Sequence, residues 1–165
     1  MDRGAAGVGD LNLNFYSFRS TWTVDLNPEE AYAVLRSIGD YDKWWPEIKE
    51  MHRIDERRVD IRARSLLPYD LWFVGEPSED PERRALTLTM TGDLEGFSRF
   101  TIEPDGRGSR LLFEEQVVAN KPLLRRLALF ARPFFVANHW VMMRRGQAGL
   151  RTFGAGYRLA HKDED

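Results

Sequence analysis

The sequence contains no cysteine. This absence excludes disulfide bridges, thiolate metal sites and cysteine nucleophiles, and it fits a reducing compartment. The three histidines, His52, His139 and His161, do not have the spacing of a metal-binding motif. We therefore predict neither a disulfide nor a metal site.

Long apolar runs are also missing. Residues 1–10 lack the apolar stretch of a signal peptide, and no run approaches the roughly 20 apolar residues that span a membrane. The longest apolar stretches are interrupted at Arg125, Arg126, Arg132 and Pro133. We expect a cytoplasmic protein with no stable membrane insertion.

Positive charge is not in excess, because 24 Lys and Arg residues face 26 Asp and Glu residues for a net charge of −2. A chain without bulk positive charge has little to attract a phosphate backbone, so we predict no nucleic-acid partner. The glycines between Gly4 and Gly9 follow no strand, and the sequence has no P-loop or Gly-x-Ser-x-Gly motif. These absences argue against phosphoryl transfer, acyl-enzyme hydrolysis and any bound cofactor.

What the sequence does contain is material for one aromatic-rich domain. Its 165 residues are 42% hydrophobic and 12% aromatic, which suffices for one core and suits the lining of a ligand pocket. We predict a flexible tail over residues 1–10, a single domain over 11–155 and a charged tail over 156–165.

The first third of this domain reads as a strand and two short helices. Alternation over residues 14–24 predicts a strand with its aromatic side chains on one face. Asn27 can cap a helix, Pro28 suits its first turn and Glu30 can complete a capping box. A second short helix is predicted over residues 41–45.

The middle of the chain reads as an antiparallel meander. Turn-like segments separate short alternating runs, among them a break at residues 77–81. The predicted strands cover residues 48–55, 59–67, 70–76, 83–91, 96–103 and 109–118.

The last part reads as a long helix that opens at Pro122 and is kinked or split at Pro133. Its inner stripe places Asn138 and His139 at the edges of an apolar face that includes two glycines, Gly146 and Gly149. Each glycine costs about 1 kcal/mol relative to alanine in a helix. Their placement on the inner face indicates either close approach to a sheet or space left for something else.

This order of elements, with four local stretches, resembles the START-like (SRPBCC) superfamily and its polyketide cyclase/dehydrase and lipid-transport group. The stretches are Thr23–Tyr32, Tyr41–Pro46, Gly92–Gly96 and Asn138–Met142. The resemblance implies an α+β helix-grip fold, in which a curved seven-stranded antiparallel sheet wraps around the C-terminal helix. Two short helices would lie between the first two strands, and an apolar cavity between sheet and helix.

Strand and helix alternation predicts which side chains face that cavity. Glu115 alternates in phase with the inward-facing side chains of its strand, so it should point into the cavity. A buried carboxylate needs a partner, a proton or a wet cavity. The candidate ligand-binding residues are Tyr16, Phe18, Trp22, Ser65, Tyr69, Phe73, Met90, Phe100, Phe113, Glu115, Phe135, Asn138, His139 and Met142.

Glu115 and His139 are also the candidate catalytic residues, although no complete catalytic set is evident. Glu115 is either a polar anchor or base in the cavity, or a strand-end residue turned outward. His139 and Asn138 either bind a ligand carbonyl or tie the helix to a neighbouring strand or loop, and we favour the tie. The Trp44–Pro46 segment is either a flap over the cavity mouth or a structural plug.

Residues 122–132 have an apolar face flanked by arginines. A basic amphipathic helix can rest on a membrane surface, but packing against the domain or a partner subunit is the commoner explanation.

Three functions remain open from the sequence. The first is binding, transport or sequestration of a small hydrophobic ligand such as a lipid, polyketide or aromatic. The second, implied by the resemblance, is aldol cyclisation and dehydration of a polyketide. The third is a homodimeric interaction module with a vestigial cavity.

Overall fold

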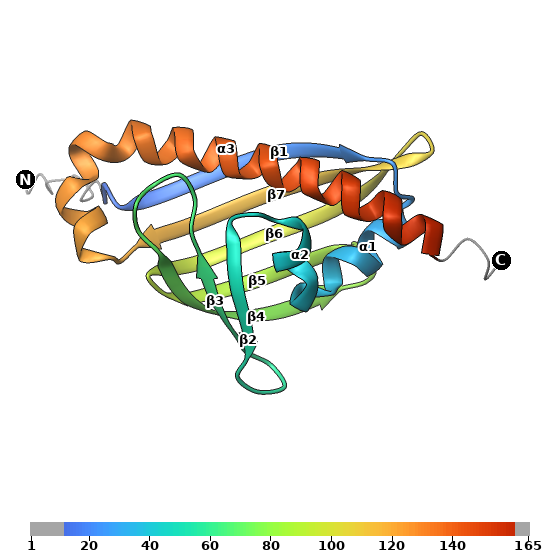
Figure 1. Ribbon diagram of the computed structural model, residues 1–165, viewed down its shortest axis with the longest axis horizontal. Coiled ribbons are helices and arrows are strands. Elements are labelled where there is room, and N and C mark those ends of the chain that lie inside the picture. The colour runs from blue at the N-terminus through green and yellow to red at the C-terminus, as the bar shows by residue number, and fades with distance from the viewer. Residues whose placement is uncertain (1–11, 161–165) are drawn as a thin grey trace, which may run out of the picture.

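A computed structural model describes residues 12–160, apart from the side chains of residues 127–129, 131 and 159. The predicted tail over residues 1–10 lies outside this range. Seven strands and three α-helices follow one another as in Figure 1, with one short 3-10 turn, η1, before α2. The elements are β1 (Phe15–Val24), α1 (Pro28–Arg36), η1 (Ile38–Asp40), α2 (Tyr41–Trp44), β2 (Ile48–Arg53), β3 (Val59–Ala63), β4 (Leu71–Asp80), β5 (Ala85–Gly92), β6 (Leu94–Asp105), β7 (Gly108–Ala119) and α3 (Pro122–Ala160).

The strands form one antiparallel sheet in the order β1-β7-β6-β5-β4-β3-β2. Figure 1 shows this sheet curving around α3, with α1 and α2 on the same side as that helix. The α+β helix-grip prediction is therefore confirmed, including the short helices between the first two strands.

The local sequence explains how α1 begins. The Asn27 side chain accepts a hydrogen bond from the Glu30 backbone N–H at 2.9 Å, and the Glu30 carboxylate accepts one from the Asn27 N–H at 2.8 Å. This capping box satisfies two backbone donors that the first turn leaves unpaired. The predicted start of the helix is confirmed.

The predicted break at residues 77–81 is wrong, because β4 continues through Pro77 to Asp80. The neighbouring β3 pairs with β4 only as far as Gly75, so beyond that residue β4 has β5 alone as a neighbour. Proline is tolerated on such an unpaired edge, where its missing N–H costs no ladder hydrogen bond. The second strand of the meander is in turn shorter than predicted and ends at Ala63.

Helix α3 is continuous over 39 residues with Pro133 inside it. Figure 1 shows its first turns at a steep angle to the remainder, as expected of a proline-kinked helix. The helix reaches Ala160, so residues 156–160 are not the start of a tail, and residues 161–165 lie outside the described range. Its end is held because Arg158 donates to the Asp25 carbonyl at 2.6 Å.

Close packing of α3 explains its inner glycines. A Cβ at Gly146 would lie 2.7 Å from the Trp45 ring, and one at Gly149 would lie 1.7 Å from the Trp44 carbonyl oxygen. The two glycines therefore allow close approach to the segment at the end of α2 and, at Gly146, to Trp22 of the sheet. They do not leave space for a ligand. Trp44 and Trp45 are buried in the core, the arrangement of a structural plug.

Glu47 is a buried carboxylate that the sequence pattern did not reveal. Its exposed fraction is 1%, and Arg145 of α3 approaches its Oε1 atom at 3.1 Å. Burial raises the pKa of the Glu47 carboxyl, and Arg145 opposes that rise. Folding therefore favours the protonated form of this group.

The raised pKa predicts how this group affects stability. The stabilisation that comes from the preferred protonation of Glu47 in the folded state is fully present below the ordinary pKa of 4.5. It is lost as the pH rises through the higher pKa of the folded state. A Glu47→Gln variant lacks this loss, so it should gain stability relative to the wild type between about pH 4 and pH 7. Urea unfolding at several pH values measures the difference, and a difference that does not vary with pH would contradict the prediction.

A ligand cavity between sheet and helix

A cavity of about 210 Å³ lies between the concave face of the sheet and the inner face of α3. Its lining is mostly apolar and comes from every strand of the sheet. The volume is below the roughly 300–1,000 Å³ of most ligand pockets, so it suits a molecule of modest size or one end of a longer molecule. The predicted residues in its wall are Tyr16, Phe18, Tyr69, Phe73, Met90, Phe100, Phe113, Glu115, Phe135, Asn138, His139 and Met142.

Glu115 and His139 meet in the cavity wall. Glu115 points inward from β7, and its Oε2 lies 3.1 Å from the Nε2 of His139 on α3. Their side chains are only 13% and 15% exposed, and the imidazole stacks on the Phe18 ring at 3.6 Å between centroids. The Glu115 carboxyl group therefore has a hydrogen-bonding partner, and the imidazole is held by contacts on its edge and its face.

Asn138 makes the tie to a loop that the sequence analysis favoured. Its Oδ1 accepts hydrogen bonds from the Ser65 hydroxyl at 2.6 Å and from the Leu66 N–H at 3.3 Å. Both partners belong to the loop between β3 and β4. Ser65 was predicted to line the cavity, but its hydroxyl is instead part of this link between loop and helix.

Removing the acceptor should loosen this loop. We expect Asn138→Ala to lower the free energy of unfolding by about 1–2 kcal/mol, because two donors lose their partner. The Leu66 amide should also exchange its hydrogen faster. Asn138→Asp keeps an acceptor in place and should retain more of that protection, so equal exchange rates in the two variants would contradict the assignment.

Two tyrosines, Tyr16 and Tyr69, also line the cavity, and each makes an edge-to-face contact with the ring of Phe135. Burial raises the pKa of Tyr69 to about 12 and also raises the pKa of Tyr16, where Arg132 acts in the opposite direction. Both phenols are therefore neutral at pH 7. The buried Tyr16 hydroxyl has no hydrogen-bond partner in the described part of the chain, so it can donate to a polar group of a ligand.

Residues 16–153 match the protein family described as polyketide cyclase/dehydrase and lipid transport. The chain belongs to this family. No curated protein sequence gives a significant match.

Solved structures share the fold of this family member at low sequence identity. A Thermus thermophilus protein superposes with a TM-score of 0.73 at 16% identity, over 86% of this chain and 99% of the other. An aromatase/cyclase from a Streptomyces species gives 0.71 at 13% identity, over 88% and 96%. A START superfamily protein from Mycobacterium smegmatis gives 0.61 at 16% identity, over 82% and 97%. At these identities the likeness concerns the fold alone.

One predicted ligand-binding residue, Trp22 of β1, does not line the cavity. Trp22 is 1% exposed and packs edge-on against Trp45 and Phe100, in the core beyond the cavity wall. Its position in β1 points inward as the alternation predicts. The cavity does not reach it because Trp45 closes that end.

One wall of the cavity was missed by the sequence analysis. It is formed by the end of α1, by η1 and by the start of α2, through Leu35, Ile38 and Tyr41 respectively. Nearby, Arg36 and Glu79 also line the cavity and pair with each other at 3.4 Å. The helical spacing of Leu35 and Ile38 signals burial, but it does not say whether the buried face meets a core or a cavity.

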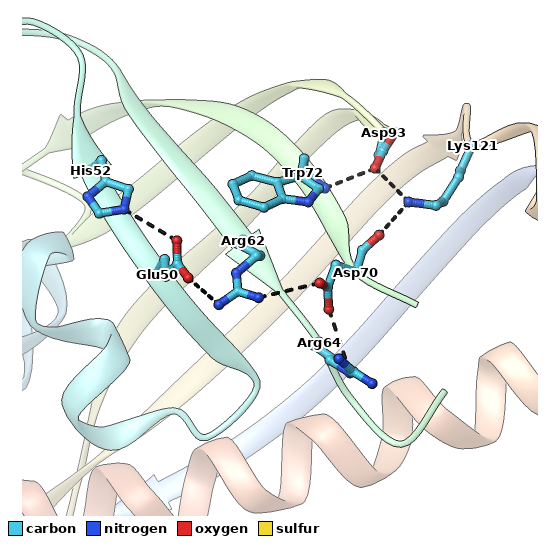
Figure 2. A network of polar contacts seen from close by, with 8 residues as sticks. All are labelled: Glu50, His52, Arg62, Arg64, Asp70, Trp72, Asp93 and Lys121. Carbon is cyan, nitrogen blue, oxygen red and sulfur yellow. Dashed lines mark hydrogen bonds and ion pairs between the residues drawn. The ribbon is translucent and has the colours of Figure 1, made fainter. Parts of the chain in front are cut away.

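A polar network on the outer side of β2–β4 holds the far end of the β3–β4 loop. Arg62 stacks over the Trp72 ring and pairs with Asp70 at 3.4 Å (Figure 2). Lys121, the residue before α3, donates to the Asp70 carbonyl and lies 3.4 Å from Asp93. The network therefore fixes both the loop and the start of α3. Its members are Glu50, His52, Arg62, Arg64, Asp70, Trp72, Asp93 and Lys121.

Proposed function

We propose that this protein binds a small, largely apolar and uncharged molecule in the cavity, for transport or sequestration. One observation carries the proposal. The acidic and basic side chains in the cavity wall are paired with each other, Arg36 with Glu79 at 3.4 Å and Glu115 with His139 at 3.1 Å. The Glu115–His139 contact is largely buried, whereas the Arg36–Glu79 pair is more exposed. A charged ligand beside Glu115 and His139 would have to break their contact or leave its own charge unpaired, and either is costly in an apolar setting.

The polar groups that remain suit a ligand with one or two oxygen atoms. The neutral Tyr16 hydroxyl is a donor without a partner among the described residues, and the Tyr69 phenol lines the same cavity. A ligand carbonyl or hydroxyl that meets them would gain a hydrogen bond in a site shielded from water. A lipid, a polyketide or an aromatic compound with a ketone has this character.

Native mass spectrometry tests the proposal. Protein purified from its own host under gentle conditions should carry a non-covalent mass that organic extraction releases and that a second mass spectrum identifies as a neutral apolar compound. Protein that is always ligand-free, and that also fails to bind neutral apolar probes, would contradict the proposal.

The Glu115–His139 contact favours a second candidate function, a polyketide cyclisation of the kind that the family description names. The Streptomyces neighbour is itself an aromatase/cyclase. In such a reaction a base removes a proton from a carbon between two carbonyls, and the resulting enolate closes a ring by aldol addition before water is lost. The carboxylate can hold the imidazole in one tautomer, as in other acid–base pairs. The neutral phenols of Tyr16 and Tyr69 could donate to the developing enolate oxygen.

Proton abstraction can be measured without knowledge of the natural substrate. If this chemistry operates, the protein should accelerate deuterium incorporation at C2 of ethyl acetoacetate in D₂O. His139→Gln and Glu115→Gln should each lower that acceleration by about 100-fold or more. No acceleration above buffer, or full acceleration in both variants, would leave binding as the function.

A further inference from the structure

Exposed apolar side chains concentrate on one surface of the molecule. Of the ten large apolar side chains that are exposed within the described residues, five lie on α3 and two more at the start of β1. Phe130, Phe134 and Trp140 are 79%, 69% and 59% exposed. The α3 surface, defined here by Phe130, Phe134, Val136 and Trp140, is therefore not packed against the domain. Of the apolar face predicted over residues 122–132, Leu124 is buried against the domain and Phe130 is not.

The start of β1 adjoins this surface. Arg132 of α3 donates hydrogen bonds to the backbone carbonyls of Leu13 and Phe15 at 2.8 and 3.0 Å, and the side chains of these two residues are exposed. In Figure 1 the orange half of α3 runs along the edge of the molecule beside β1. Exposed apolar groups that gather in this way mark an interaction site more often than scattered ones do.

The charge on α3 indicates what the surface meets. The helix carries seven arginines and no acidic residue, so the remainder of a chain with net charge −2 carries −9. Arg125 and Arg126 are exposed near Phe130, and Arg144 lies over the Trp140 ring at 4.6 Å. Aromatic rings bordered by cations match the interface of a bilayer that contains anionic lipids.

We propose that the α3 surface docks on the surface of an anionic lipid bilayer. A second copy of the chain is a poorer occupant, because a two-fold contact places the same patch on both subunits and sets the arginines of one against those of the other. No helix among residues 12–160 is long and apolar enough to cross a bilayer, so the contact is peripheral. The proposal does not depend on what the cavity holds.

Docking would bring the cavity within one helix of the lipid. The same turns of α3 present Phe135, Asn138 and Met142 to the cavity and Phe134 and Trp140 to the outside. A ligand that partitions into membranes would then enter or leave at short range. This last step rests on the proposed binding function, whereas docking itself can be measured on ligand-free protein.

Vesicle sedimentation tests the docking. We expect the full chain to sediment with vesicles of phosphatidylcholine and about 30% phosphatidylglycerol, and at least tenfold less with phosphatidylcholine alone. Phe134→Ala and Trp140→Ala should each weaken binding about tenfold, and Arg126→Ala about fivefold. Ile54→Ala and Arg107→Ala remove an exposed apolar side chain and an exposed arginine elsewhere, and they should leave binding unchanged.

Two outcomes would overturn the proposal. In the first, the protein stays in the supernatant with both vesicle types. In the second, light scattering shows a dimer that Trp140→Ala dissociates, which identifies the surface as a subunit interface. Tryptophan fluorescence gives an independent readout, since in a Trp72→Phe background Trp140 is the one strongly exposed tryptophan of the described chain. Its emission should shift to shorter wavelength on anionic vesicles.

Discussion

Replacing Gly149 by alanine should lower the free energy of unfolding by about 3 kcal/mol, which is a large effect for one methyl group. The added Cβ would lie 1.7 Å from the Trp44 carbonyl oxygen, a distance that no side-chain rotation can relieve. The helix would have to move away from the end of α2, and the packing of Trp44 and Trp45 would loosen with it. Urea unfolding followed by tryptophan fluorescence measures this loss.

Gly156 on the same helix provides the matched control. A Cβ at this position meets nothing within 4 Å, and the residue is exposed. Alanine is favoured over glycine in a helix by about 1 kcal/mol, so Gly156→Ala should stabilise the protein. Opposite signs in the two variants separate packing from helix propensity. If both variants stabilised the protein, the close contact between α3 and α2 would not exist in solution.

These glycines show what helical spacing can and cannot reveal. The spacing placed Gly146 and Gly149 on the inner face of a long helix, which is correct. It could not tell which element they approach, because periodicity gives the direction of a side chain and not the identity of its neighbour. Only the folded chain shows that the neighbours are the Trp44–Trp45 segment and, at Gly146, Trp22 of β1 as well.

The order of elements was predictable because each has its own local signal. The capping box marks the start of α1, and alternation marks both faces of β1 and β7. Local signals failed where the structure at a residue depends on which other elements pack beside it. Pro77 reads as a strand breaker, but it lies on a stretch of β4 that lacks one neighbour. Glu47 reads as a surface residue between Pro46 and Ile48, but α3 covers it.

The Glu115–His139 pair was predictable in part: local signals gave the direction of each side chain but not the contact between them. Strand alternation predicted that Glu115 points inward, and helical spacing predicted that His139 lies at the edge of the inner stripe. Their contact at 3.1 Å depends on how far α3 is shifted along β7. That shift is set by the short connection after Ala119 and by the bend in α3 around Pro133. Neither has a local pattern from which its geometry could be derived.

Filling the cavity gives the second large effect that we expect. Ser98 lies in the middle of the sheet on β6, opposite Glu115 in the ladder, and it lines the cavity. A phenylalanine at this position would place its ring in a space of about 210 Å³. We expect Ser98→Phe to weaken the binding of N-phenyl-1-naphthylamine, a neutral fluorescent apolar probe, by tenfold or more, because ring and probe would compete for the same volume.

Arg99→Phe is the matched control, since it adds the same ring to the exposed outer face of the same strand. Probe affinity should match that of the wild type in this variant. The filled variant should also unfold at the same urea concentration as the wild type, within about 1 kcal/mol, because its ring occupies space that is already empty. A Ser98→Phe protein that stays folded and binds the probe with unchanged affinity would move the binding site out of the cavity.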